Sequence, residues 1–126
     1  MRYNEKIKSE GLYPKNTGRI IDPDGIGDYS GENDGDRSVF FIKVKNKRIV
    51  EVKYQVYGCL AAIASCSATS LLVEGRLLKE ALRIDDGVVD RYLEGFPEHK
   101  KICSNIGSSA LRLAIKDYYE RLKTNA

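Results

Sequence analysis

Apolar and polar residues alternate over two neighbouring stretches in the first half of the chain, and this pattern predicts a β-hairpin. One face of the first strand is expected to carry Phe40, Ile42 and Val44, and one face of the second Val50, Val52, Tyr54 and Val56. Charged residues fill most of the positions between them. We therefore expect two antiparallel strands joined at Asn46-Lys47, with one face towards a core and the other in contact with water.

A helical pattern replaces the alternation after Gly58. Residues 60–68 are rich in alanine and nearly free of charge, which is typical of a helix buried on all sides, and Gly75 marks its expected end. A second long helix is expected after a cap at Ser104 or Asn105. Its apolar residues recur at helical spacing, at Leu111, Ile115, Tyr118 and Leu122.

Shorter helices are expected at 2–10, at 77–82 and after a cap at Asp85 or Asp86. In contrast, residues 22–36 alternate acidic residues with glycine and offer almost no apolar side chain for burial. We expect that segment to be a solvated, mobile loop. Strands followed by helices predict an α+β fold, with helices packed on one face of a small antiparallel sheet.

Length and charge restrict the classes of protein to consider. A chain of 126 residues with 42% hydrophobic residues fits one compact domain spanning 1–126. Its 21 basic and 18 acidic residues are interleaved and leave a net charge of only +3, so we expect no nucleic-acid partner. The longest uncharged stretch, 54–73, contains glutamine, serine and threonine, which argues against a membrane span. Three cysteines and a charged N-terminus without an apolar leader favour the reducing cytoplasm.

Cysteine chemistry is the main candidate for function. Hydrolase mechanisms are disfavoured because His99 is the only histidine and no serine lies in a nucleophile-elbow motif, and the phosphate-loop and EF-hand patterns are incomplete. Cys59 begins a predicted helix and Cys103 precedes the last one, where the positive helix end favours a thiolate. With Asp34 and Asp36, these thiols could converge on one metal site. The alternative is that both cysteines are small core residues.

Longer motifs allow a more specific interpretation. Residues 57–67 read Tyr-Gly-Cys-Leu-Ala-Ala-Ile-Ala-Ser-Cys-Ser, and further short motifs lie at 14–18, 35–36, 73–81 and 103–104. In order and spacing they resemble the conserved elements of the iron–sulfur cluster assembly scaffold family, the U-type scaffold also found as the N-terminal domain of NifU. The motif at 57–67 is the most specific, because it is similar to that family's Tyr-Gly-Cys-x-x-Ala-Ile-Ala-Ser-x-Ser.

This resemblance implies a fold and a function. The fold is a three-stranded antiparallel sheet packed against helices. The function is that of a non-enzymatic scaffold that receives sulfur from a cysteine desulfurase as a persulfide on Cys103, and passes clusters to acceptor apo-proteins. The cofactor is a labile iron–sulfur cluster of the 2Fe–2S type, or Zn²⁺ in its place. The ligands carried over from the family's motifs are Asp34, Asp36, Cys59 and Cys103.

The sequence also departs from the family's pattern. The family's first cysteine falls on Asp34 and its histidine on Ile102, and a carboxylate in place of a thiolate should hold iron less tightly. The chaperone-recognition element falls on 96–100 and keeps only Pro97 and Lys100, so we do not expect recognition by an Hsp70-type chaperone.

Two alternatives therefore stay open: a relative that acts as a protein-binding adaptor without a cluster, and a small zinc-binding module. Among the remaining candidate ligands, Cys66 is expected in the core, because two helical turns separate it from Cys59. His99, one turn before Cys103, is expected in solvent, as lone loop histidines usually are.

Overall fold

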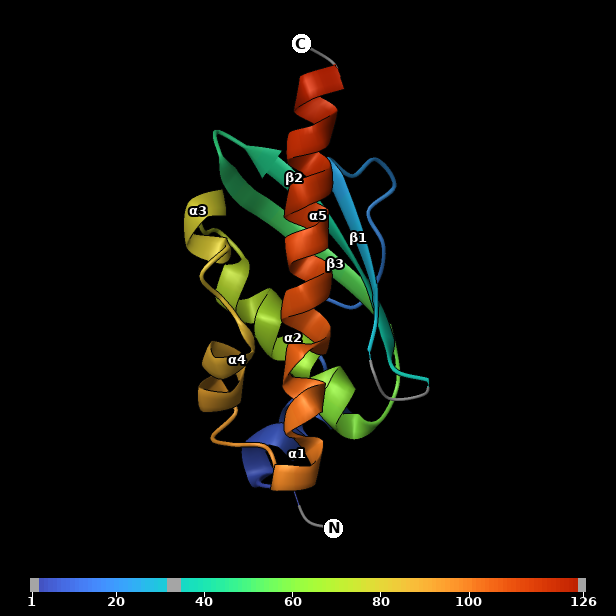
Figure 1. Cartoon of the computed structure of the whole chain (residues 1–126), viewed down its shortest axis with the longest axis vertical. Helices are drawn as coiled ribbons and strands as arrows, with labels where there is room; N and C mark the ends of the chain where they lie inside the picture. Colours follow the sequence, from blue (N-terminus) through green and yellow to red (C-terminus); the bar gives the residue numbers. More distant parts are fainter. Residues whose placement is uncertain (1–2, 32–34, 125–126) are drawn as a thin grey trace.

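The protein is described by a computed structural model, which covers residues 3–31 and 35–124. A sheet of three antiparallel strands in the order β1-β2-β3 is packed against helices on one face (Figure 1). The elements in chain order are α1 (Glu5–Leu12), β1 (Gly25–Ser30), β2 (Arg37–Lys45), β3 (Arg48–Tyr57), α2 (Leu60–Val73), α3 (Leu78–Ala81), α4 (Asp86–Tyr92), the 3₁₀ helix η1 (Glu98–Ser104) and α5 (Asn105–Thr124). The expected α+β class and the three-stranded sheet are confirmed.

The expected hairpin is present as β2 and β3. Asn46 and Lys47 form its turn with φ of 53° and 63°, the left-handed conformation that suits the twist of a two-residue hairpin loop. On the core side Phe40 stacks on Tyr54 with ring centroids 5.2 Å apart. Both side chains are fully buried, so this pair fixes the register of the hairpin against the helices.

Two details of the predicted alternation were wrong. A β-bulge between Lys43 and Val44 pairs Val44 with Ile49, so Ile49 is buried and Val50 is 51% exposed; the extra residue reverses the phase of the strand. On the face expected to be wet, Phe41 is only 5% exposed, and the Arg19 guanidinium lies 6.0 Å from its ring centroid.

The expectation of a solvated loop over 22–36 was wrong for its middle part, which forms β1 and pairs with β2. β1 is buried through glycine: a Cβ on Gly25 would clash with the carbonyl oxygen of Ala114, and a Cβ on Gly27 with that of Ala110. The backbone of α5 therefore occupies the space that side chains would fill in another strand. The burial signal was the alternation of glycine, not of apolar residues.

The two long helices lie where the pattern placed them. α2 is buried on nearly all sides, packs against β3 and contacts α5, which crosses β1 and β2. The predicted apolar stripe of α5 is only partly buried: Leu111 and Ile115 are in the core, but Leu122 is 49% exposed, because the end of α5 extends past the sheet (Figure 1).

The shorter helices agree with the sequence in part. The Asp85 carboxylate caps α4 by accepting from the Val88 N–H group at 3.0 Å, as expected. α1 is capped by Asn4 and continues through Gly11 to Leu12, two residues beyond its predicted end. The 3₁₀ helix η1 was not predicted. Within the described residues no helix is both long and apolar enough to cross a membrane.

Candidate functional site

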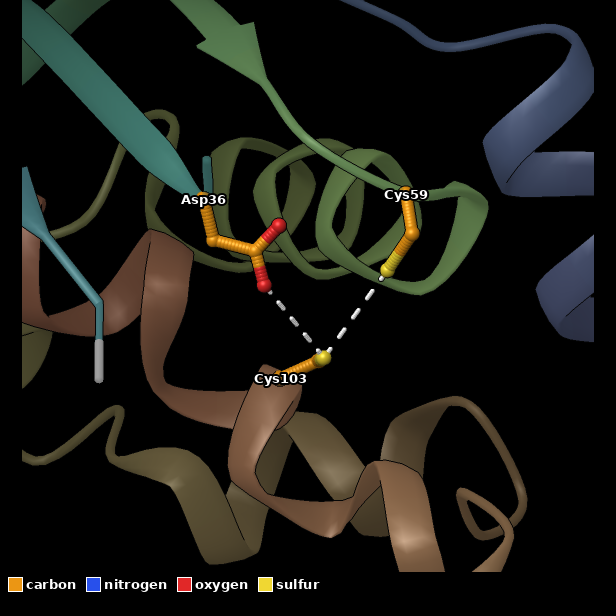
Figure 2. Close-up of side chains that lie close together, drawn as sticks. All are labelled: Asp36, Cys59 and Cys103. Carbon is orange, nitrogen blue, oxygen red and sulfur yellow. Dashed lines mark hydrogen bonds between the residues drawn. The ribbon is translucent and has the colours of Figure 1, made fainter. Parts of the chain in front are cut away.

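Three chain segments bring two thiols and one carboxylate together at one end of the molecule (Figure 2). Asp36 directly precedes β2, Cys59 is the N-cap residue of α2, and Cys103 lies in η1. Figure 2 shows the Asp36 and Cys59 side chains both directed at the Cys103 sulfur. Among the described residues, this is the group of cysteine, histidine and acidic side chains whose ligand atoms all lie within 4.8 Å of one another.

The distances within this group match those of a tetrahedral metal site. The two sulfurs are 3.9 Å apart, and the Cys103 thiol donates to Asp36 Oδ2 over 3.7 Å. Around a tetrahedral zinc with bonds of about 2.3 Å to sulfur and about 2.0 Å to oxygen, these separations would be about 3.8 Å and about 3.5 Å. Both separations are within a few tenths of an ångström of the tetrahedral values, and the third, between Cys59 and Asp36, is no more than 4.8 Å.

Asp36 is held inward by the backbone around it. Gly35 has φ of +87°, a conformation that favours glycine, and the Gly31 N–H group donates to the Asp36 carbonyl oxygen at 2.9 Å. Across the site, a Cβ on Gly58 would clash with Asp36 Oδ1. Glycine at 58 therefore leaves the room in which the carboxylate, only 8% exposed as a residue, faces the cysteines.

The two cysteines are positioned by α2. Cys59 has extended backbone geometry at the N-cap and its side chain makes no capping hydrogen bond; its sulfur is directed at Cys103 (Figure 2). Cys103 is fully buried. The Ser65 hydroxyl of α2 donates to the Ser104 carbonyl at 3.2 Å and accepts from the Gly107 N–H group at 3.1 Å, which fastens the junction of η1 and α5 to the helix that begins at Cys59.

Burial and negative charge shape the electrostatics of the site. The pKa of the Cys103 thiol is raised above its ordinary value, first by burial and then by the neighbouring Cys59 and Asp36 charges. The Lys100 ammonium opposes these effects. Its Nζ lies 3.9 Å from the Cys59 sulfur, and attraction to the Cys59 thiolate is the main cause that raises the pKa of Lys100. A divalent cation would neutralise the negative charge that accumulates when both thiols ionise.

The sequence-based candidates fall into three groups. The structure brings Asp36, Cys59 and Cys103 together, whereas Asp34 lies outside the described residues. His99 is exposed and does not belong to the group. Cys66 is fully buried in the core, as expected, and burial raises the pKa of its thiol.

Lys100 was not identified as a site residue from the sequence. The available signal was its spacing of three residues from Cys103, because residues i and i+3 share a face of a 3₁₀ helix. This spacing is informative only if a 3₁₀ helix is expected at 98–104, and η1 was not predicted.

The arrangement suits a borderline or soft metal. Thiolates favour zinc and iron–sulfur species over magnesium or calcium, and one carboxylate adds a harder and more labile donor. The ligand types and their spacing therefore fit the metal or cluster that the motifs imply.

Comparison with known proteins agrees with this chemistry. Residues 2–125 match the family described as "NifU-like N terminal domain". The chain is 40% identical over 119 residues to the "Iron-sulfur cluster assembly scaffold protein IscU 1" of Archaeoglobus fulgidus, covering 94% of this chain and 78% of that protein. It is 36% identical over 118 residues to the "Iron-sulfur cluster assembly scaffold protein IscU" of Aquifex aeolicus, covering 92% and 75%.

A solved structure shares the fold. The crystal structure of a "Nitrogen-fixing NifU-like protein (N-terminal)" from Brucella abortus superposes with a TM-score of 0.77 at 18% identity, covering 94% of each chain.

Proposed function

Since this chain belongs to the NifU-like N-terminal domain family, we propose that it is an iron–sulfur cluster assembly scaffold that holds iron and sulfide on Asp36, Cys59 and Cys103. The observation that carries this proposal is the convergence of the three ligand atoms, in which the Cys59–Cys103 and Cys103–Asp36 separations already approach those of a tetrahedral metal site. The adaptor alternative is not favoured, because binding another protein requires no such convergence of thiols and a carboxylate.

Asp34 is proposed as the fourth ligand, in the place of the family's first cysteine. Two thiolates would hold iron firmly and two carboxylates would hold it loosely. This mixture suits a scaffold, which has to release what it assembles. The cluster, proposed as a labile 2Fe–2S species, is cargo for acceptor apo-proteins, and the chain itself would turn over no substrate.

Sulfur is proposed to arrive on Cys103 from a cysteine desulfurase. The Cys103 thiolate would attack the terminal sulfur of the desulfurase persulfide, form a new S–S bond and release the desulfurase cysteine as thiolate, with no net oxidation. Because Cys103 is fully buried, this step requires η1 to move away from α2. Trapping of the persulfide by alkylation, followed by mass spectrometry, tests this assignment in the variants Cys59→Ala and Cys103→Ala. If only Cys103→Ala forms a persulfide, the assignment to Cys103 is wrong.

The central test is anaerobic reconstitution with ferrous iron, cysteine and a cysteine desulfurase, followed by visible absorption and by iron, zinc and sulfide analysis. We expect a coloured species with sulfide bound in the wild type and its loss in Cys59→Ala. Cys66→Ala is the matched control, because Cys66 is a free cysteine in the core and its removal should leave the chromophore unchanged. Bound zinc without sulfide would favour the zinc-binding module, the second candidate that the tetrahedral spacing supports.

Asp34→Cys provides a second test of the ligand set. A third thiolate should slow the loss of the reconstituted chromophore to excess chelator, since a thiolate donates more strongly to iron than a carboxylate does. If Asp34→Cys leaves the lifetime unchanged and Cys59→Ala loses no chromophore, the proposed ligand set is wrong.

A further inference from the structure

The end of the molecule opposite the cysteine site carries an apolar groove with a basic rim. The groove has a volume of about 440 Å³ and lies where α3 and the end of α5 meet. Its lining is apolar at Leu77, Tyr118, Tyr119 and Leu122 and basic at Lys47 and Lys79. In Figure 1, α3, the β2–β3 turn and the C-terminal half of α5 lie together at this end, far along the long axis from the start of α2.

A second depression continues the groove along α5. It has a volume of about 460 Å³, shares Tyr119 with the first, and is lined by Leu82 and by the basic residues Arg112, Lys116 and Lys123, with Glu120 as the acidic group. Large apolar side chains are exposed here, with Tyr119 at 41% and Leu82 at 37%. From Arg112 to Lys123 the surface extends roughly 16 Å along the helix axis. We call the two depressions together the distal groove.

Positive charge is concentrated around the distal groove. The three segments that contribute its lining residues, 43–51, 74–83 and 112–124, contain eleven of the 21 basic residues of the chain but only five of its 18 acidic ones. Their net charge is +6, so the rest of the chain carries −3. The near-neutral total hides this asymmetry. A binding partner of the distal groove therefore has to be negatively charged at its edges and apolar at its centre.

We propose that the distal groove binds an acidic amphipathic segment of a partner protein, whose aliphatic or aromatic side chains cover Tyr119 and Leu122 while aspartate and glutamate side chains meet the lysine rim. A polypeptide fits better than a nucleic acid, which has no aliphatic side chains to fill an apolar floor. It also fits better than a lipid surface, which cannot enter a groove between two helices.

This proposal goes beyond the scaffold function and does not depend on it. The distal groove shares no lining residue with Asp36, Cys59 and Cys103. A partner held there would leave the cysteine site free, and it would bind whether or not a metal is present.

An unbiased peptide selection on the metal-free protein tests the proposal. Random 12-residue peptides displayed on phage are selected on the wild type, and clones retained by the double variant Lys79→Glu/Tyr119→Ala are removed. We expect the surviving peptides to carry net negative charge and at least two large apolar residues. An excess of basic or uncharged peptides, or retention of the same clones by the double variant, would show the proposal to be wrong.

Single variants then locate the binding surface, with the best selected peptide measured by fluorescence anisotropy. We expect Tyr119→Ala and Lys79→Glu each to weaken binding about tenfold. The matched controls are Tyr13→Ala, which removes a tyrosine that is 71% exposed elsewhere, and Arg91→Glu, which makes the same change of charge on α4. Both should change binding less than about twofold. Equal weakening by Lys79→Glu and Arg91→Glu would mean that only the net charge of the protein matters, and would overturn the proposal.

Three competing occupants are tested with the same variants. A single-stranded oligonucleotide or anionic phosphatidylglycerol vesicles that bind more tightly than every selected peptide, with the same loss in Tyr119→Ala, would assign the surface to nucleic acid or membrane instead. Sedimentation of the wild type as a dimer that Tyr119→Ala converts to a monomer would assign it to a second copy of this chain.

Discussion

The cysteine site and the distal groove occupy opposite ends of the molecule and are built in different ways. The cysteine site consists of side chains that are largely withdrawn from water and held within 4.8 Å of one another by packing between three segments. The distal groove consists of exposed side chains on one helix and its neighbours. The first should therefore respond to small steric changes and to pH, and the second to charge and ionic strength.

Two glycine substitutions give the largest expected contrast. Gly58→Ala puts a methyl group where Asp36 Oδ1 lies, so we expect zinc affinity to fall about 100-fold through displacement of the carboxylate. Gly75→Ala, after α2, meets no atom within 4 Å but sits at φ of +82°. It should cost about 1 kcal/mol of unfolding free energy and leave zinc affinity unchanged. Competition titration with a zinc chelator and urea unfolding measure the two effects, and equal zinc affinity in both variants would contradict the steric role of Gly58.

The pH dependence of metal binding sharpens the comparison. The pKa of the Cys103 thiol is raised by burial and by neighbouring negative charge, so at neutral pH the metal has to displace its proton. Release of the Cys103 proton should therefore contribute an increase in zinc affinity of about tenfold per pH unit between about pH 6.5 and about pH 8.5. In Cys103→Ala this contribution should be absent, so that binding of zinc releases one proton fewer. Peptide binding at the distal groove should be constant over the same range, because neither a cysteine nor a histidine is among its lining residues.

Ionic strength should separate the two ends in the opposite sense. Raising salt from about 50 mM to about 300 mM should weaken peptide binding at the distal groove about threefold to tenfold, because exposed charges are screened. Zinc affinity should change less than about twofold, since its ligands contact the metal directly. Anisotropy and chelator competition at each salt concentration measure both. A peptide affinity insensitive to salt would mean that the basic rim contributes nothing.

The smallest effect is expected at an exposed ion pair near the cysteine site. Arg37 donates two hydrogen bonds to the Asp28 carboxylate, at 2.9 and 2.6 Å, and these lower the pKa of Asp28 below its ordinary 3.8. The carboxylate is half exposed, so Asp28→Asn should cost less than about 1 kcal/mol of unfolding free energy at pH 7.

The lowered pKa also fixes the sign of the pH effect at this pair. The stabilisation is present above the ordinary pKa of Asp28 and is lost as pH falls through the lowered value. Urea unfolding of the wild type and of Asp28→Asn should therefore converge in acid. A difference that persists there would have to come from the substitution itself and not from the charge.

The residue pattern located Cys59 and Cys103 at helix starts but did not predict the first strand of the sheet, which only the family resemblance implied. Cys59 and Cys103 each stand at the start of a helical segment, so their positions followed from local signals together with the family motifs. β1 escaped prediction because its contacts are made by backbone. Gly25 and Gly27 carry no apolar side chain that a hydrophobicity pattern detects, yet they lie against the carbonyl groups of α5.

Charge clustering could not be predicted in the same way. Lys47, Lys79 and Lys116 lie far apart in the sequence: Lys47 belongs to a basic run, whereas Lys79 and Lys116 each stand beside an acidic residue. They meet around one groove only because α3, the hairpin turn and α5 pack at the same end. Leu122 belonged to the predicted buried stripe of α5, but no pattern along a helix reveals where the sheet beneath it ends.

The close contact of β1 with α5 also determines when the site can form during synthesis. β1 is synthesised before α5, the last described helix, so the β1–β2 pair has no α5 backbone to pack against until α5 follows. Asp36 lies between β1 and β2, and Cys103 is among the last residues before α5. Asp36 and Cys59 are therefore synthesised well before Cys103, and the three ligands meet only when η1 and α5 dock.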